Sequence, residues 1–68
     1  MIMKPVVSSN LVAVGYDCDT NVLRIQFKSG TYDYYDVPIS IYYGLMSASS
    51  LGKFHHIYIK NSFKYRKL

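Results

Sequence analysis

Three segments of the chain alternate between apolar and other side chains with a period of two, as half-buried strands do. They are residues 10–17, 22–27 and 31–37, and clusters of turn-forming residues separate them. Short polar connections between consecutive strands favour an antiparallel meander. The alternation places Val12, Val14 and Tyr16 on one face of the first strand, Leu23, Ile25 and Phe27 toward the core in the second, and Tyr32 and Tyr34 on one face of the third.

The period changes after Pro38, a residue that suits the first turn of a helix. A second helix can begin at Ser49 or Ser50, because serine is a good N-cap residue. The helical stripes comprise Ile41, Leu45 and Ala48 in the first helix, and Phe54, Ile57 and Tyr58 in the second, where His55 and Ile59 recur at a similar spacing.

Residues 61–68 return to strand-like alternation and carry positive charge, which predicts a fourth strand at an edge of the sheet. The predicted order is βββααβ: an antiparallel three-stranded meander, two short helices and a C-terminal strand. This is an α+β fold, and the whole chain, residues 1–68, is expected to form one domain.

Composition adds an expectation about assembly and location. Half of the 68 residues are hydrophobic and 18% are charged, which is apolar for a monomer of this size and predicts a homo-oligomer. The single cysteine excludes an internal disulfide, and no apolar run approaches the roughly 18 residues that span a bilayer. The start of the chain lacks the apolar region of a signal peptide. A cytoplasmic protein without a membrane partner is therefore expected.

Charge is distributed unevenly along the chain. All four acidic residues lie within residues 17–36, whereas residues 53–68 hold five basic residues and no acidic one. A positive field near many tyrosines favours a ligand with phosphate and a base, although a basic tail with no partner has the same pattern.

The segment Ser50–Lys53 is the strongest candidate for an anion site. Ser50, the amide of Gly52 and the Lys53 ammonium would converge at a helix start, where unsatisfied N–H groups suit phosphate. The alternative is that Ser50 only caps the helix. Tyr32 and Tyr34 also have two interpretations, as core residues or as a surface on which bases stack.

Metal binding and catalysis are not expected. The segment DCDTN resembles the start of a calcium loop, but Val22 stands where the loop needs glycine and Lys28 where it needs glutamate. Adjacent histidines, His55 and His56, project about 100° apart on a helix and do not chelate one metal. The chain has no glutamate, and its aspartates lack the spacing of an acid–base pair. No catalytic residue and no cofactor is predicted.

The order of these short motifs resembles the KTSC domain family, which occurs at the C-terminus of some lysyl-tRNA synthetases and as stand-alone proteins. The resemblance covers nearly the whole chain. It differs at His55 and His56, where many members have an aromatic residue and asparagine, and at Leu51, which is often basic. The matching motifs are SSNLVAVGYD at 8–17, L-R-I-Q-F at 23–27, Gly30, Tyr32 and Tyr34, DVP at 36–38, Y-x-x-L-M-x-A at 42–48, S-x-G-K-F at 50–54, Ile59 and F-K-Y-R-K-L at the end.

The resemblance implies a single α+β domain, and RNA binding has been proposed for the family. From charge and tyrosines, we expect a non-catalytic homo-oligomer that captures a nucleotide-type anion. One such role is a phage-encoded protein that sequesters a host immune nucleotide inside the infected cell. Lys28, in the turn after the second strand, is expected to lie far from the site. The alternatives are an RNA-binding module that uses the same surface and a phosphodiesterase-like enzyme. The candidate ligand-binding residues are Ser8, Ser9, Asn10, Tyr32, Tyr34, Ser50, Gly52, Lys53, Phe54, His55, His56, Lys60, Tyr65 and Arg66.

Overall fold

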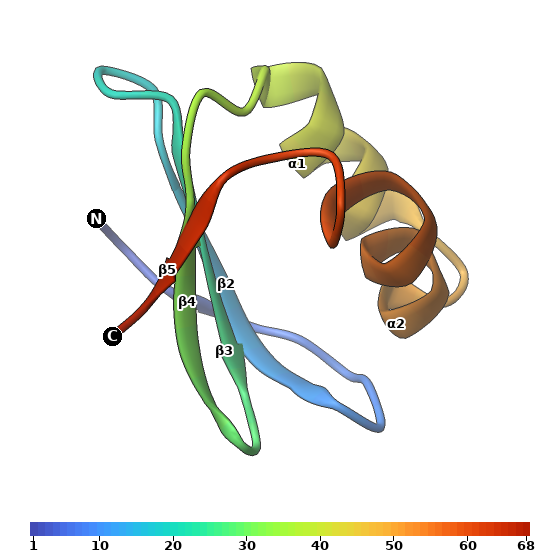
Figure 1. Ribbon diagram of the computed structural model, residues 1–68. Helices are drawn as coiled ribbons and strands as arrows, with labels where there is room; N and C mark the ends of the chain where they lie inside the picture. Colours follow the sequence, from blue (N-terminus) through green and yellow to red (C-terminus); the bar gives the residue numbers. More distant parts are fainter.

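The alternating segments pair as antiparallel neighbours, and two short helical segments lie against one face of the resulting sheet (Figure 1). The computed structural model describes residues 1–68. The α+β class and the central meander are confirmed. The elements are β1 (Lys4–Pro5), β2 (Leu11–Asp17), β3 (Val22–Phe27), β4 (Gly30–Tyr34), α1 (Ile39–Ser47), α2 (Leu51–Phe54), η1 (His55–Ile59, a π-helix) and β5 (Tyr65–Lys67).

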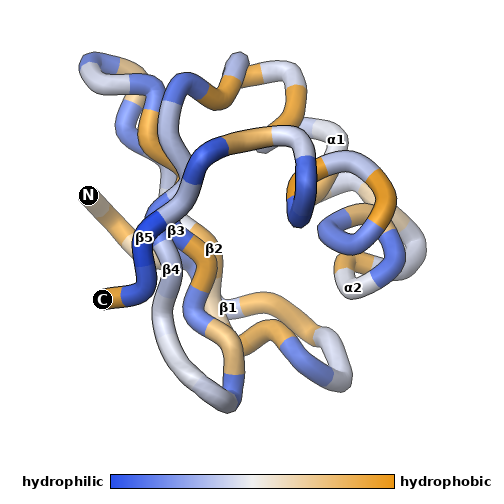
Figure 2. The backbone as a smooth tube through the Cα atoms, viewed as in Figure 1, coloured by the Kyte–Doolittle hydropathy of each residue, from blue (hydrophilic) through white to orange (hydrophobic).

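The sheet has five strands in the order β1-β2-β3-β4-β5, one more than the sequence pattern predicts. The additional strand, β1, is two residues long and pairs with β2, too short to show any alternation. The C-terminal strand β5 pairs with β4 at the other edge, as predicted, and is a hydrophilic segment in Figure 2. Both chain ends lie on the side of the sheet away from the helices.

The prediction for the first strand is wrong about which of its residues share a face. Its register against β3 shifts between Leu11 and Ala13, which is the signature of a β-bulge. The extra residue turns Leu11 to the same side as Val14, and both are buried, while Val12 is 38% exposed. The prediction that Val12 shares the inward face with Val14 is therefore wrong, because strict alternation does not extend across a bulge.

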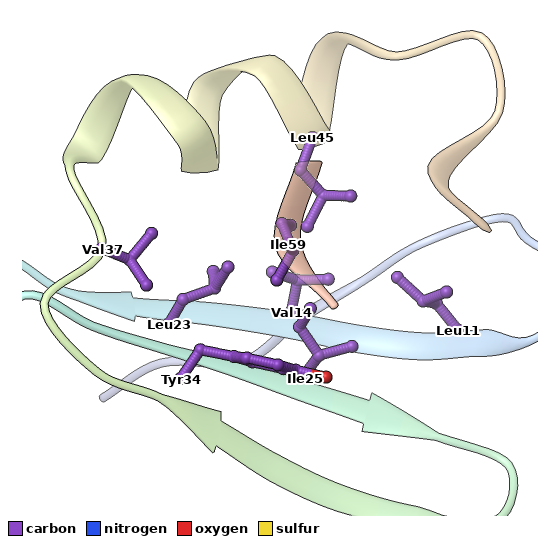
Figure 3. Packing of buried hydrophobic residues seen from close by; sticks show 8 residues of the cluster. All are labelled: Leu11, Val14, Leu23, Ile25, Tyr34, Val37, Leu45 and Ile59. Carbon is purple, nitrogen blue, oxygen red and sulfur yellow. The ribbon is translucent and has the colours of Figure 1, made fainter. Parts of the chain in front are cut away.

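One core lies between the sheet and the helical segments. Its residues come from three strands, the β4–α1 connection, α1 and η1, so it joins distant parts of the chain (Figure 3). The predicted inward positions Leu23, Ile25 and Leu45 are fully buried. The core residues are Leu11, Val14, Leu23, Ile25, Tyr34, Val37, Leu45 and Ile59.

The second helical segment is not a regular α-helix. After one turn of α2 it widens into η1, where the Lys60 amide donates to the His55 carbonyl, five residues back. The wider turn changes which residues face the sheet. Ile59 is buried, whereas Ile57 and Tyr58 are 64% and 52% exposed, so the predicted stripe through these two residues is wrong.

Close packing of the helical segments depends on Gly44 in α1. A Cβ atom at this position would lie 2.6 Å from Cζ of Phe54, so only glycine allows the Phe54 ring to approach. Neither α1 nor the shorter segments have the length and apolar character needed to cross a membrane.

Candidate ligand-binding cleft

A cleft opens where the helical layer stops covering the sheet, between the β3–β4 turn and η1. It consists of two adjoining hollows of about 260 and 440 Å³. We call them the aromatic hollow and the polar hollow, and they share Phe27, Ser29, His55 and Lys60. The aromatic hollow is completed by Tyr32, Tyr34, Asn61 and Tyr65, and the polar hollow by Asn10, Lys28, Gly52 and His56.

Strand alternation and register place the rings of the aromatic hollow together. Tyr32 and Tyr34 lie on the helix-facing side of β4, and Tyr65 in β5 pairs directly with Tyr34. The Tyr65 ring centroid lies 5.8 Å from those of both Tyr32 and Tyr34. Phe27 meets Tyr32 edge to face at 5.7 Å. These rings form a continuous aromatic wall, and the prediction that Tyr32 and Tyr34 share a face is confirmed.

His55 stands between the two hollows and is held on two sides. Its ring meets Phe27 edge to face at a centroid distance of 4.8 Å. Its Nε2 shares a hydrogen bond of 2.8 Å with the Tyr34 hydroxyl. Burial lowers the pKa of His55, and the charges of Lys60 and His56 lower it further. Burial, with smaller contributions from Tyr32 and Tyr65, raises the pKa of Tyr34 to about 12. At neutral pH this bond therefore joins two uncharged groups.

The π turn explains why His55 and Lys60 line the same cleft. In an α-helix, with 3.6 residues per turn, residues five apart point in different directions. In a π turn the hydrogen bond spans five residues, which brings such residues closer to the same side. His55 and Lys60 are joined by this bond, and both line both hollows. A wide turn of this kind is common at functional sites.

Cations surround the cleft and carboxylates are absent from its walls. Lys28 and Lys60 line the polar hollow. Lys67 pairs with Tyr32 across the strands, and its Nζ lies 5.9 Å from the Tyr32 ring centroid. No group of three or more His, Cys, Asp or Glu side chains lies close enough together to hold a metal ion. The electrostatic field in the cleft therefore favours an anion.

The structure brings eight of the fourteen predicted site residues into this cleft. Three more, Ser9, Ser50 and Lys53, line a third hollow of about 630 Å³ next to the polar one, which we call the outer hollow. The eight residues in the cleft are Asn10, Tyr32, Tyr34, Gly52, His55, His56, Lys60 and Tyr65.

Ser8, Ser50 and Phe54 have structural contacts of their own. The Ser8 hydroxyl accepts from the amides of Asn10 and Leu11 and so shapes the turn before β2. The Ser50 hydroxyl accepts from the Lys53 amide, which is the capping role that the sequence left as an alternative. Phe54 packs on Tyr58, at a centroid distance of 4.6 Å, and against α1.

The structure separates Arg66 from the other predicted residues. Arg66 pairs with Asp33, so it lies on the sheet face without helices, where Arg24 binds the Asp33 carboxylate through two hydrogen bonds of 2.7 and 2.9 Å. Adjacent strand residues point to opposite faces, so Arg66 cannot share the cleft with Tyr65. The alternation of side chains in residues 61–68 already indicates that Arg66 and Tyr65 point to opposite faces.

The expectation for Lys28 is also corrected. Lys28 lines the polar hollow together with His55 and Lys60, because the β3–β4 turn extends beneath η1. The sequence reasoning also missed Phe27, Ser29 and Asn61 as cleft residues. Phe27 continues the inward alternation of Leu23 and Ile25, so that pattern could have identified it. Nothing local distinguishes Ser29 or Asn61 from ordinary turn residues.

Residues 7–63 match the family model of the KTSC domain. The chain belongs to the KTSC domain family. A KTSC domain protein from Yersinia pestis has a crystal structure that matches this one with a TM-score of 0.96 and 43% sequence identity, over 98% of this chain and 96% of that chain. The resemblance of the sequence motifs to this family is thereby confirmed.

Relatives of two sizes carry this KTSC domain. A protein of Tsukamurella paurometabola is 40% identical over 63 residues, which are 91% of this chain and 94% of that protein. A lysine–tRNA ligase of Nostoc sp. is 37% identical over 68 residues, which are 98% of this chain and 12% of the ligase. The same fold therefore accounts for nearly all of one relative and for a small part of another.

Proposed function

We propose that this KTSC domain is a non-catalytic binding module whose cleft captures a nucleotide-type anion. The observation that carries the proposal is that an aromatic wall and several cations line one cleft that contains no carboxylate. A flat base can stack on Tyr32, Tyr65 or Phe27, and such stacking contributes about 1–3 kcal/mol per base. The ammonium groups of Lys28 and Lys60 supply charge-assisted hydrogen bonds to phosphate.

Binding without turnover fits the state of the groups in the cleft. General acid–base catalysis needs a positioned group that exchanges protons near the working pH. Tyr34 has a pKa of about 12, and its hydroxyl engages Nε2 of His55. The pair therefore suits hydrogen bonding to a neutral part of a ligand, and the ligand is released unchanged. A phosphodiesterase-like reaction would instead leave a cleaved product.

Self-association is part of this proposal. Apolar side chains of α1 and η1 remain exposed on the helical side of the molecule, among them Tyr43 at 59% and Ile57 at 64%. Ile57 also lines the outer hollow, so a second copy packed there would lie beside the binding region. We expect sedimentation at micromolar concentration to show a species larger than the 7.9 kDa monomer. A concentration-independent monomer would contradict the homo-oligomer.

The binding proposal is tested by calorimetry with a panel of nucleoside 5′-monophosphates and cyclic mononucleotides. At least one should bind with a fixed stoichiometry and be recovered intact after heat denaturation of the protein. Lys28→Ala and Lys60→Ala should each weaken binding about tenfold, since each removes a charged hydrogen-bond donor. The matched control is Arg66→Ala, which removes the same charge from the opposite face of the sheet and should leave affinity unchanged.

RNA binding is the alternative, and the KTSC domain within a lysine–tRNA ligase of Nostoc sp. is the observation that favours it. An RNA-binding surface would show affinity that grows with oligonucleotide length and falls linearly with salt on a log–log plot. Arg66→Ala would then weaken RNA binding about as much as Lys28→Ala and Lys60→Ala do. Length-dependent RNA binding without any affinity for mononucleotides would replace the proposed function by this alternative.

A further inference from the structure

The three hollows form a single line. The aromatic hollow shares Phe27, Ser29, His55 and Lys60 with the polar hollow, and the polar hollow shares Asn10, Gly52 and His56 with the outer hollow. The aromatic and outer hollows share no residue. The polar hollow therefore lies between the other two, and a ligand that leaves the aromatic hollow through the polar hollow reaches the outer hollow next. A further hollow, lined by residues 60–65, adjoins the aromatic hollow elsewhere and shares Lys60, Asn61 and Tyr65 with it.

The chemistry of the walls changes along this line. Phe27 and three tyrosines line the aromatic end. The polar hollow keeps one aromatic hydrocarbon ring, Phe27, and adds Lys28 and His56. The outer hollow has no phenyl or phenol ring, and the lysine in its wall is Lys53. The number of aromatic rings therefore decreases from the aromatic hollow to the outer hollow, whereas every hollow has at least one lysine in its wall.

This gradient determines which way a nucleotide lies. A base in the outer hollow would forgo the stacking that Tyr32 and Tyr65 offer at the other end. Phosphate oxygens can accept from tyrosine hydroxyls, but ammonium groups also supply the opposite charge, and Lys28 lines the polar hollow while Lys53 lines the outer one. The favourable orientation places the base at the aromatic end and the phosphate in the polar hollow, with His55 beside the part of the ligand that joins them.

Resting on the proposed function, we propose that the ligand is a nucleotide with at least two phosphate groups, bound in one orientation. The base lies against Tyr32 and Tyr65, the first phosphate binds Lys28 and Lys60, and the second phosphate reaches Lys53 in the outer hollow. Lys28 and Lys53 then recognise different phosphates, although both are exposed lysines at the rim of the same groove.

The test is a ladder of three ligands measured by calorimetry on the full chain: a nucleoside, its 5′-monophosphate and its 5′-diphosphate. The base is the one that binds most tightly in the monophosphate panel. Affinity should rise by about tenfold at each step, as expected for a charged hydrogen bond gained per phosphate. Inorganic pyrophosphate serves as a probe that has the phosphates without the base.

Each lysine variant should reduce one step of the ladder. Lys28→Ala should reduce the gain from nucleoside to monophosphate, for which Lys60 then remains the one lysine, and keep the gain from monophosphate to diphosphate. Lys53→Ala should do the reverse and leave the affinities for nucleoside and monophosphate unchanged. Tyr65→Ala should weaken all three nucleoside-containing ligands and leave any pyrophosphate affinity as it is. All three side chains are exposed, so thermal melting should show that the variants remain folded.

The outcomes separate this inference from the function on which it rests. A diphosphate that binds no tighter than the monophosphate overturns the second phosphate position, while the proposed nucleotide binding stands. Lys28→Ala and Lys53→Ala that weaken the three ligands equally overturn the single orientation. Failure of every nucleotide to bind overturns both the orientation and the proposed function.

Discussion

Leu23 and Phe27 lie on the same face of the same strand, yet their surroundings differ completely. Leu23 is fully buried beside Val37, where the helical layer covers the sheet. Phe27 is only partly buried and lines the cleft with His55 and Lys60. One end of the sheet face is thus sealed by aliphatic side chains, and the other end presents aromatic rings to the solvent.

Two tyrosines show what this difference does to one type of side chain. Tyr16 and Tyr34 flank Leu23 in one row across the sheet. The Tyr16 hydroxyl donates to the Val37 carbonyl at 2.6 Å, a bond to the backbone that holds the β4–α1 connection. The Tyr34 hydroxyl instead bonds to the His55 side chain in the cleft wall. The first contact joins a strand to the backbone of a connection, whereas the second joins two side chains of the cleft wall. Stability and the candidate function therefore draw on different parts of one sheet face.

The largest effect should come from the covered end. Leu45→Ala removes a fully buried side chain and should lower the free energy of unfolding by ~2–5 kcal/mol, because it leaves a cavity. Urea denaturation measures this loss. The control is Tyr43→Ala on the same helix, where the side chain is exposed and the change should stay within about 0.5 kcal/mol. Equal losses for both variants would contradict the assignment of the core.

Phe27→Ala should distinguish a cleft residue from a core residue, because it should affect nucleotide affinity more than stability. Phe27 already retains contact with solvent in the folded state, so its truncation should cost less unfolding free energy than Leu45→Ala. It should nevertheless lower nucleotide affinity about tenfold, because it removes a stacking surface. Denaturation and calorimetry on the same variant measure both quantities. A stability loss as large as that of Leu45→Ala would place Phe27 in the core and not in a binding cleft.

Tyr34→Phe removes the hydrogen bond to His55 while keeping the buried ring. We expect a loss of about 1 kcal/mol in unfolding free energy, the net value of one such bond. Tyr65→Phe is the matched control in the same aromatic wall, because the Tyr65 hydroxyl makes no intramolecular hydrogen bond. If both variants unfold alike, the Tyr34–His55 bond contributes nothing to stability.

The lowered pKa of His55 predicts how stability depends on pH. The folded state binds a proton at His55 less readily than the unfolded chain, whose histidine has a pKa of about 6.5. The contribution to stability is therefore complete above pH 6.5 and is lost as the pH falls below that value toward the folded-state pKa. Urea denaturation at pH 7.5 and pH 5 should show a smaller difference for His55→Gln than for the wild type. His56→Gln should reduce the difference by less than His55→Gln, because burial is the largest cause of the lowered pKa of His55 and the charge of His56 a smaller one.

The smallest effect is expected on the sheet face without helices. Arg66→Ala should change the unfolding free energy by no more than about 0.5 kcal/mol, because Arg66 is exposed and the Asp33 carboxylate already binds Arg24. Nucleotide affinity should also be unchanged. A loss of affinity would mean that the ligand reaches around the edge strand β5, and the contrast between the two ends of the helix-facing side would no longer locate the site.

Much of the fold follows from local patterns. The inward positions of β3 and the shared face of Tyr32 and Tyr34 agree with the structure, as does the buried Leu45 of α1. The errors occur where a local irregularity interrupts a period. The bulge in β2 exposes Val12, and the π turn in η1 exposes Ile57 while it buries Ile59. Each irregularity adds one residue to a regular repeat of inward-facing positions. The period of the residues before it therefore does not predict which residues after it face the core.

The sequence by itself determined the pairing order of the central strands, most of the core and the membership in the KTSC family, because period and turn chemistry act between near neighbours in the chain. The alternation also implies that Arg66 and Tyr65 face opposite ways, although both were predicted as site residues and the structure corrects this for Arg66. Only the tertiary structure placed Lys28, in a turn, in the same hollow as His55 of η1 and Lys60 at its end. This proximity depends on how the helical layer packs on the sheet and on the π turn closed by the bond from the Lys60 amide to the His55 carbonyl. Residues 28 and 55 are far apart in the sequence, so no local pattern predicts that they line one hollow.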